Sequence, residues 1–367
     1  MSRDEIDTPV LLIDLDMLER NIKTMSDYYR GKKGAALRPH QKGHRLPLIA
    51  RKQIDSGAIG VSMTSLGLAE FYVNSGIDDI LITSEISNPT KITRLCNLSK
   101  HSNLHVGVDD LSNVKQLSDA ARRNNTKINV AVEVYMGAWG SAGVPLGRLK
   151  LFVEEITKFS GIDLTGIWWH EGQVARANFE QRRKMEFNLL DELSAVISEI
   201  EDSGIDVRML SGGFTPTWNI TPEYPKMSNI QVQAGNYVFS DWTSHLIEGL
   251  EVFDNALTVL TRCISRPTPT EALFDFGMNS CSDESGEDYS KVVGPQFKQL
   301  EGVKTVFERE ELAQVIFTQP NSQVRVGDLF ELVPPHADTT AKLHDRYYGI
   351  REGTVEVIWP NYGRGFL

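Results

Sequence analysis

Eight short apolar segments, each of a length suited to one buried strand, recur between residues 35 and 235. Amphipathic segments of helical period fill most of the gaps between them. The strand candidates begin near residues 35, 58, 79, 104, 128, 164, 207 and 230, and the helical candidates include 16–29, 45–56, 65–74, 88–99, 111–124 and 179–203. Eight strand-then-helix units predict an α/β protein with a (β/α)8 TIM barrel. A doubly wound open sheet is the alternative, but no GxGxxG follows the first of these strands, and this favours the barrel.

The pattern changes after about Trp242, where helical periodicity fades and short β-like runs separated by Gly, Pro and Asp take over. These runs predict a second, mostly β domain. We therefore expect a barrel at 16–245 and a β domain at 246–367, into which the opening strand within 1–15 also pairs.

Composition and charge narrow the class of protein. The apolar fraction is 41%, typical of a globular chain, and no apolar run approaches the roughly 18 to 20 residues of a membrane span. The net charge of −11 argues against nucleic acid or an anionic membrane as a partner. The three cysteines form no CxxC pair, and the charged start lacks a secretory h-region. We expect a cytoplasmic protein that acts on a small molecule.

Glycine-rich loops follow the last two strands of the predicted barrel. Barrels commonly bind phosphate there, because glycine lets backbone N–H groups approach an oxyanion and hydroxyl groups add donors. Ordinary turns are the alternative for such glycines. The candidate phosphate ligands are Ser211, Gly212, Gly213, Thr215, Gly235, Asn236 and Tyr237.

A lysine follows the first barrel strand within a cluster of basic residues. Lys42 stands among Arg38, His40, His44 and Arg45, and neighbouring cations lower the pKa of an ammonium group, as a Schiff-base lysine requires. A basic surface loop is the alternative. Together with a phosphate-binding site after the last two strands, Lys42 points to pyridoxal phosphate spanning the barrel mouth, with His40 and Arg38 as further cofactor ligands.

A second candidate site lies in the predicted β domain. In extended chain, residues i and i+2 face the same side, so His336 and Asp338 could offer an imidazole and a carboxylate to one divalent cation. A polar turn after Pro334 and Pro335 is the alternative.

Several motifs, in this order and over nearly the whole chain, resemble the fold type III pyridoxal phosphate enzymes of the D-threonine aldolase and D-serine dehydratase group. These motifs are LLIDLDMLERNI after Pro9, RPHQKGH around Lys42, SGGFTPT, GNYVFSDW, PPHADTT and the closing HDRYYGIREGTVEVIWP. The resemblance implies an alanine racemase-like barrel followed by a β domain, and two subunits paired head to tail in a homodimer.

The resemblance also implies roles for individual residues. Lys42 is the implied Schiff-base lysine, His336 and Asp338 are the implied ligands of a divalent metal (Mn, Mg or Zn), and the glycine-rich loops are the implied phosphate site. Aldolases of this group carry Asp at the second metal position and D-serine dehydratases carry Cys, so Asp338 favours an aldolase.

Other positions depart from the family pattern. The GAGRxG segment, whose arginine faces the pyridine nitrogen, here reads GAWGSAG. His170 stands where the family has tyrosine, and Arg176 where a metal-linked histidine falls. Asn279 replaces a lysine, and Glu311-Leu312-Ala313 replaces E-H-G. These changes alter the substrate side of the predicted site.

We therefore expect a metal-assisted lyase that cleaves the Cα–Cβ bond of a 3-hydroxy-D-amino acid by retro-aldol chemistry. His170 is the candidate base, and Arg176 is a candidate ligand of a substrate carboxylate. β-Elimination of water with Lys42 as base is the runner-up, and racemisation is third. A protein that carries pyridoxal phosphate without turnover is the alternative outside the enzymes.

Overall fold

The computed structural model describes residues 1–138, 141–285 and 292–366. The chain divides into two compact units. We call the first the barrel unit, which comprises Met25–Lys42, Leu46–Gly235 and the end of the chain. The second, the β unit, comprises Met1–Thr24, Gly43–Arg45 and Asn236–Gly365. Helix α1 (Leu15–Tyr29) crosses the boundary, so the units divide within this helix and at Asn236, whereas the sequence placed the boundaries at 16 and 245.

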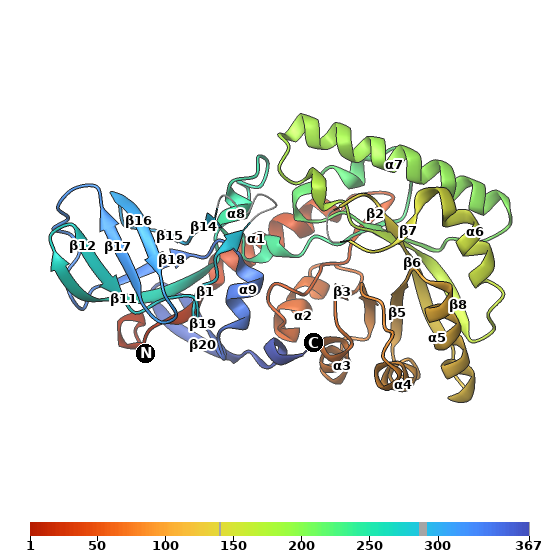
Figure 1. Ribbon diagram of the computed structural model, residues 1–367, viewed down its shortest axis with the longest axis horizontal. Coiled ribbons are helices and arrows are strands. Elements are labelled where there is room, and N and C mark those ends of the chain that lie inside the picture. Colours follow the sequence, from red (N-terminus) through yellow and green to blue (C-terminus); the bar gives the residue numbers. More distant parts are fainter. Residues whose placement is uncertain (139–140, 286–291, 367) are drawn as a thin grey trace. The chain divides into compact units, whose positions relative to one another are not determined.

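The barrel unit contains eight parallel strands with helices outside them (Figure 1). The strands are β2 (Ala35–Leu37), β3 (Val61–Met63), β4 (Asp79–Ile82), β5 (Asn103–Val108), β6 (Ile128–Tyr135), β8 (Ile162–Trp169), β9 (Met209–Gly212) and β10 (Ile230–Val232). Their order in the sheet is β2-β10-β9-β8-β6-β5-β4-β3, and the short β7 (Val144–Pro145) pairs with β6. All eight strands match the predicted segments.

The two edges of this sheet meet just beyond β2. The backbone N–H of Gln41 donates to the carbonyl of Ser62 over 2.8 Å, and the N–H of Ser62 donates to the carbonyl of Pro39 over 3.1 Å. Residues 39–41 therefore continue β2 alongside β3, with His40 and Ser62 as the paired residues. This pairing closes the sheet into a barrel, so the open doubly wound alternative is excluded.

Helices begin where the sequence supplies a side chain to cap them. Ser65, Asn88, Asp110 and Asn178 each accept a hydrogen bond from a backbone N–H in the first turn of the helix that follows. The helices between strands are α2 (Pro47–Asp55), α3 (Leu66–Asn74), α4 (Pro89–Leu98), α5 (Leu111–Arg123), α6 (Leu146–Ile156) and α7 (Phe179–Asp202). Helix α6 was not among the predicted segments, and two 3-10 turns at Thr215–Thr217 and Thr221–Glu223 stand between β9 and β10.

Side chains fill the barrel interior. Leu81, Ala131, Trp168 and Met209, from four different strands, form one buried apolar cluster. A filled interior leaves the loops at the carboxyl ends of the strands as the place for a ligand.

The β unit is built on a mixed sheet in the order β16-β17-β12-β11-β1-β19-β20, with β18 also paired to β11 and β15. Its strands are β1 (Val10–Asp14), β11 (Leu257–Thr268), β12 (Glu271–Phe274), β15 (Gln296–Phe297), β16 (Val303–Glu308), β17 (Ala313–Phe317), β18 (Leu329–Val333), β19 (Arg346–Arg351) and β20 (Thr354–Pro360). A separate two-stranded sheet pairs β13 (Glu284–Ser285) with β14 (Val292–Val293), and the two helices wholly within this unit are α8 (Trp242–His245) and α9 (Ala337–Lys342). The opening strand β1 lies between β11 and β19, as the sequence predicted.

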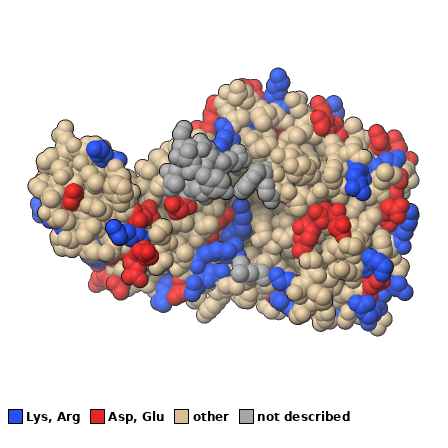
Figure 2. Space-filling view, viewed as in Figure 1, with Lys and Arg blue, Asp and Glu red and all other residues tan. Residues whose placement is uncertain are grey.

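Basic and acidic side chains are interspersed over most of the face shown in Figure 2. In the described part of the chain, no helix has the length and apolar character needed to cross a membrane.

Candidate functional site

Lys42 ends the segment that closes the barrel, and its side chain is exposed. Its backbone N–H donates to Nδ1 of His40 over 3.2 Å. Nδ1 of His40 is thus an acceptor, so the proton of the neutral imidazole lies on Nε2, which can donate to the hydroxyl of Thr83 over 3.3 Å. These contacts fix the backbone that carries the lysine.

Arg38 lies at the opposite end of the strands. Its guanidinium pairs with Asp79 over 2.6 Å, at the start of β4, and also donates to Gln231 over 2.6 Å. A Cβ on Gly60 would come within 2.5 Å of this guanidinium, so the side chain needs a glycine beside it. The sequence suggested Arg38 as a cofactor ligand, but its partners give it a structural role at the amino ends of the strands.

His44 and Arg45, the other basic neighbours of Lys42 in the sequence, are buried in the β unit. The carbonyl of His44 accepts a hydrogen bond from the hydroxyl of Tyr347 over 2.9 Å. Both side chains are therefore buried, whereas the side chain of Lys42 is exposed.

His170 follows β8 and lies close enough to Lys42 for the two charges to interact. The side chain keeps some contact with solvent, yet desolvation by the surrounding protein and, secondly, the Lys42 ammonium lower its pKa to about 4. The ring packs edge-on against Phe214, with centroids 5.2 Å apart, and a Cβ on Gly172 would lie 2.8 Å from Nε2. Its neutral imidazole at neutral pH can accept a proton. Arg176 lies farther along the same loop and is exposed.

The loop after β9 depends on its glycines. A Cβ on Gly212 would lie 2.0 Å from the indole of Trp169, and Gly213 has φ +72, where other residues are strained. Ser211 is fully buried, and its hydroxyl donates to the carbonyl of Gln231 over 3.1 Å. Thr215 opens the 3-10 turn that follows. Because the Ser211 hydroxyl already donates inside the barrel, it does not supply a donor for an anion at this loop.

The loop after β10 begins with an equally close approach. A Cβ on Gly235 would lie 2.2 Å from the carbonyl oxygen of His40. The glycine therefore lets this loop lie directly on the segment that carries Lys42. The 3-10 turn Asn236–Val238 follows in the β unit, where the Asn236 amide donates to Asp241 over 2.9 Å and Tyr237 is buried.

The donor set of the barrel unit fits a phosphorylated aldehyde such as pyridoxal phosphate. The exposed side chain of Lys42 carries a primary amine that can form a Schiff base, and two glycine-containing loops follow neighbouring strands at the place where barrels commonly bind phosphate. Lys42, the loop at 212–215 and Gly235 are the residues of this unit that would hold it.

His336 and Asp338 face each other, although not in the way the sequence suggested. The predicted extended segment was wrong, because His336 caps helix α9 and Asp338 lies in its first turn. Nε2 of His336 is nevertheless 3.8 Å from Oδ2 of Asp338. Nδ1 of His336 contacts the Thr339 hydroxyl over 3.0 Å, which leaves Nε2 on the side of Asp338.

This pair fits two ligands of a divalent cation, since imidazole suits Zn²⁺ and carboxylate suits Mg²⁺ or Mn²⁺. No group of three or more His, Cys, Asp or Glu side chains suited to a metal occurs among the residues that the structure describes. Water and substrate would therefore have to complete the coordination of a metal held here.

Three acidic residues near the carboxyl ends of neighbouring strands, Glu85, Asp109 and Glu133, were not identified as candidates from the sequence. Glu133 on β6 is buried, and desolvation, a hydrogen bond with Glu85 and the charge of Asp109 raise its pKa to about 10. Glu133 is thus protonated at neutral pH. A single charged residue inside an otherwise apolar strand was the signal that could have identified it. Trp139 and Gly140 of the GAWGSAG segment lie outside the described residues.

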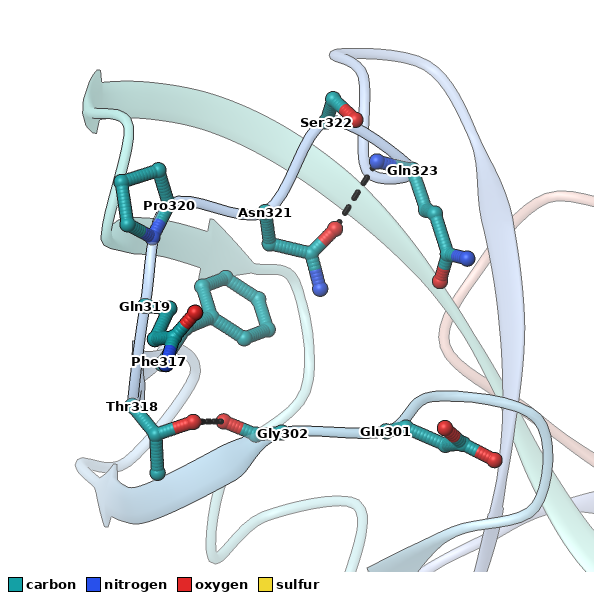
Figure 3. Close-up of a pocket in the computed structure, with 9 residues that line it drawn as sticks. All are labelled: Glu301, Gly302, Phe317, Thr318, Gln319, Pro320, Asn321, Ser322 and Gln323. Atoms are coloured by element: carbon teal, nitrogen blue, oxygen red, sulfur yellow. Dashed lines mark hydrogen bonds between the residues drawn. The ribbon is translucent and has the colours of Figure 1, made fainter.

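A hollow of about 330 Å³ lies elsewhere, in the β unit, between Glu301 and Gln323 (Figure 3). Its walls come from the end of β17 and the loop beyond it, including Phe317, Thr318 and Asn321. Glu301 is the one ionisable group among its lining residues, so it offers no base or nucleophile pair.

Comparisons with known proteins cover the chain from end to end. The family described as "Alanine racemase, N-terminal domain" matches residues 13–239, and the family described as "Putative serine dehydratase domain" matches residues 256–350. The chain is 32% identical to 3-hydroxy-D-aspartate aldolase of Paracoccus denitrificans (strain Pd 1222), over 100% of this chain and 94% of the relative. It is 30% identical to D-threonine aldolase of an Arthrobacter species, over 98% and 93% respectively.

Solved structures of related proteins share the fold of this chain. D-threonine aldolase from Filomicrobium marinum superposes with a TM-score of 0.92 at 28% identity, over 99% of this chain and 97% of that chain. A more distant relative, D-threo-3-hydroxyaspartate dehydratase of Delftia sp. (strain HT23), is 26% identical over 77% of this chain and 74% of its own length. Carbon–carbon cleavage and dehydration thus both occur among proteins with similar sequences.

Proposed function

Because the chain belongs to the D-threonine aldolase-like family of fold type III pyridoxal phosphate enzymes and is therefore a carbon–carbon lyase, we propose that it cleaves a 3-hydroxy-D-amino acid with the help of a divalent metal. The bond broken is Cα–Cβ. The 3-hydroxyl proton leaves, Cβ becomes an aldehyde carbonyl, and Cα takes up a proton to give an amino acid shortened at that bond.

The identity of 32% and 30% to two aldolases over nearly the whole chain supports this assignment most strongly. His170, the candidate base, has a pKa lowered to about 4 and lies within electrostatic reach of Lys42. A neutral imidazole can take the 3-hydroxyl proton, whereas an imidazolium could not. Lys42 would hold pyridoxal phosphate, whose ring would supply an electron sink for the broken bond. His336 and Asp338 would hold a metal, whose positive charge would favour loss of the hydroxyl proton.

Arg176 bears on which 3-hydroxy-D-amino acid is the substrate. An exposed guanidinium can bind a carboxylate through two parallel hydrogen bonds. We propose that Arg176 binds a side-chain carboxylate, which makes 3-hydroxy-D-aspartate a better substrate than D-threonine. The two relatives with 30% or more identity described above carry the names of aldolases for these two compounds.

Product analysis tests the proposal. The purified protein is incubated with pyridoxal phosphate and Mn²⁺, Mg²⁺ or Zn²⁺, or with EDTA, and given D-threonine or 3-hydroxy-D-aspartate. We expect glycine with acetaldehyde from the first and glycine with glyoxylate from the second, and a loss of rate in EDTA. An oxo acid with ammonia would instead identify the dehydratase alternative, the opposite enantiomer a racemase, and no turnover a cofactor carrier.

Arg176→Met tests the substrate assignment, with Arg122→Met, an exposed arginine on α5, as the matched control. We expect Arg176→Met to raise KM for 3-hydroxy-D-aspartate at least tenfold and to change KM for D-threonine less than threefold. Equal changes for both substrates would contradict a carboxylate-binding role. The homodimer is part of the same proposal, and the mass of the protein in solution tests it.

A further inference from the structure

Two fully buried carboxyl groups lie behind the glycine loop that follows β9. Glu171 comes directly after His170, and Glu186 lies on helix α7. Both have 0% exposure. Burial of a carboxylate costs free energy unless the group is paired or protonated. Two buried carboxyl groups near each other therefore need a structural or functional explanation.

Glu171 is bonded to the loop at two points. Oε1 accepts a hydrogen bond from the hydroxyl of Thr217 over 3.1 Å, and the carboxyl also accepts one from the backbone N–H of Gly213. The Thr217 hydroxyl in turn accepts from the backbone N–H of Phe214 over 3.1 Å. One carboxyl group thus holds both ends of the 213–217 segment.

Glu186 supports the same loop one turn farther along. Its Oε1 accepts from the hydroxyl of Thr221 over 2.7 Å. That threonine packs against Gly213, where a Cβ would lie 3.1 Å from its hydroxyl oxygen. Both carboxyl groups therefore contact side chains that shape Gly213.

The second oxygen of each carboxyl, Oε2, is buried and has no hydrogen-bond partner among the described residues. Desolvation and the charge of Glu186 raise the pKa of Glu171, and desolvation raises that of Glu186 to about 7. A protonated carboxyl keeps one acceptor oxygen for a hydroxyl donor and removes the cost of a buried charge.

We propose that Glu171, backed by Glu186, is a positioning residue that sets the 213–217 loop for the phosphate of pyridoxal phosphate. It acts through Gly213 and Thr217 and does not contact the cofactor. An uncharged acid suits this place, because a negative charge behind the loop would oppose the binding of a dianionic phosphate. The inference rests on the cofactor of the family and not on the proposed substrate.

The test compares two ligands that differ only in the phosphate. Cofactor is removed from the holoenzyme, and the dissociation constants of pyridoxal phosphate and of pyridoxal are measured by the absorbance of the Schiff base. We expect Glu171→Ala to weaken pyridoxal phosphate about 10- to 100-fold and pyridoxal less than threefold, because two buried donors lose their acceptor. Glu171→Gln, which keeps an acceptor oxygen without charge, should stay within about threefold of the wild type for both ligands.

Thr217→Val provides a second measurement in case Glu171→Ala does not fold, since it removes only the hydroxyl between carboxyl and loop. It should also weaken pyridoxal phosphate selectively. Glu199→Ala, an exposed glutamate on the same helix as Glu186, is the matched control and should change neither constant. Equal losses for both ligands, or a Glu171→Gln variant as weak as Glu171→Ala, would overturn the proposal. Wild-type protein that forms no Schiff base with either ligand would instead contradict the cofactor assignment on which the proposed function depends.

Discussion

Replacement of Gly235 by alanine tests whether the loop after β10 must lie on the Lys42 segment. The added Cβ would lie 2.2 Å from the carbonyl oxygen of His40 and 2.9 Å from its carbonyl carbon. A carbon and an oxygen that are not bonded rarely approach closer than about 3.2 Å, so one of the two backbones has to retreat by roughly 1 Å. The obstacle is backbone, which cannot rotate away as a side chain can.

We expect Gly235→Ala to lower the free energy of unfolding by about 3 kcal/mol, the upper part of the range for overpacked sites. Because His40 accepts from the Lys42 N–H, the same displacement moves the lysine, and pyridoxal phosphate should bind at least tenfold more weakly. Urea denaturation measures the first quantity, and titration of the Schiff-base absorbance measures the second.

Gly204→Ala is the matched control. Gly204 has φ +86 and nothing within 4 Å of a Cβ, so this variant adds backbone strain of about 1 kcal/mol without a clash. It should leave cofactor affinity unchanged. A Gly235→Ala protein within 0.5 kcal/mol of the wild type (roughly the scatter of neutral surface substitutions) and with normal affinity would refute the reasoning.

Three further changes test other parts of the structure. Arg38→Met should cost about 2 kcal/mol in urea denaturation by removing the charge-assisted hydrogen bond to Asp79, which is partly exposed and keeps the Asn103 amide as a partner, and a normal stability would contradict the structural role. Burial, with a smaller effect of nearby Arg38, lowers the pKa of His105 to about 4, so between pH 7.5 and 5 His105 becomes protonated in the unfolded chain but stays neutral in the folded protein. The free energy of unfolding should therefore fall by about 2 kcal/mol from pH 7.5 to 5. His105→Gln should remove that part of the loss. Thr339→Val should weaken Mn²⁺ binding in calorimetry about tenfold by freeing the His336 ring, and unchanged affinity would speak against this contact as a support for a metal ligand.

The strands and the barrel could be predicted because buried parallel strands are short apolar runs with a regular spacing. The helix at Leu146–Ile156 was missed, since Pro145 and Gly147 at its start are turn formers that obscure the pattern. The His336 segment was predicted as extended chain, in which residues i and i+2 face the same side, with a polar turn after two prolines as the alternative, yet a helix begins at Ala337.

The loops that carry the candidate site followed from the rule that barrels bind ligands at the carboxyl ends of their strands. The direction in which individual side chains point could not be predicted from this rule. Arg38 stands four residues before Lys42 but reaches the other end of the barrel, where Asp79 offers a carboxylate. Glu133 and Glu171 could not be singled out from the sequence, because burial beside other acidic residues, which raises their pKa values, is visible only in the folded chain.

The most direct measurement of the central claim is the attachment point of the cofactor. Protein loaded with pyridoxal phosphate is reduced with borohydride, digested and analysed by mass spectrometry, beside Lys42→Ala treated in the same way. The account predicts a phosphopyridoxyl group on Lys42 in the wild type and none on the variant. A group on another lysine, or equal labelling of both proteins, would contradict the assignment of Lys42 and with it the proposed site.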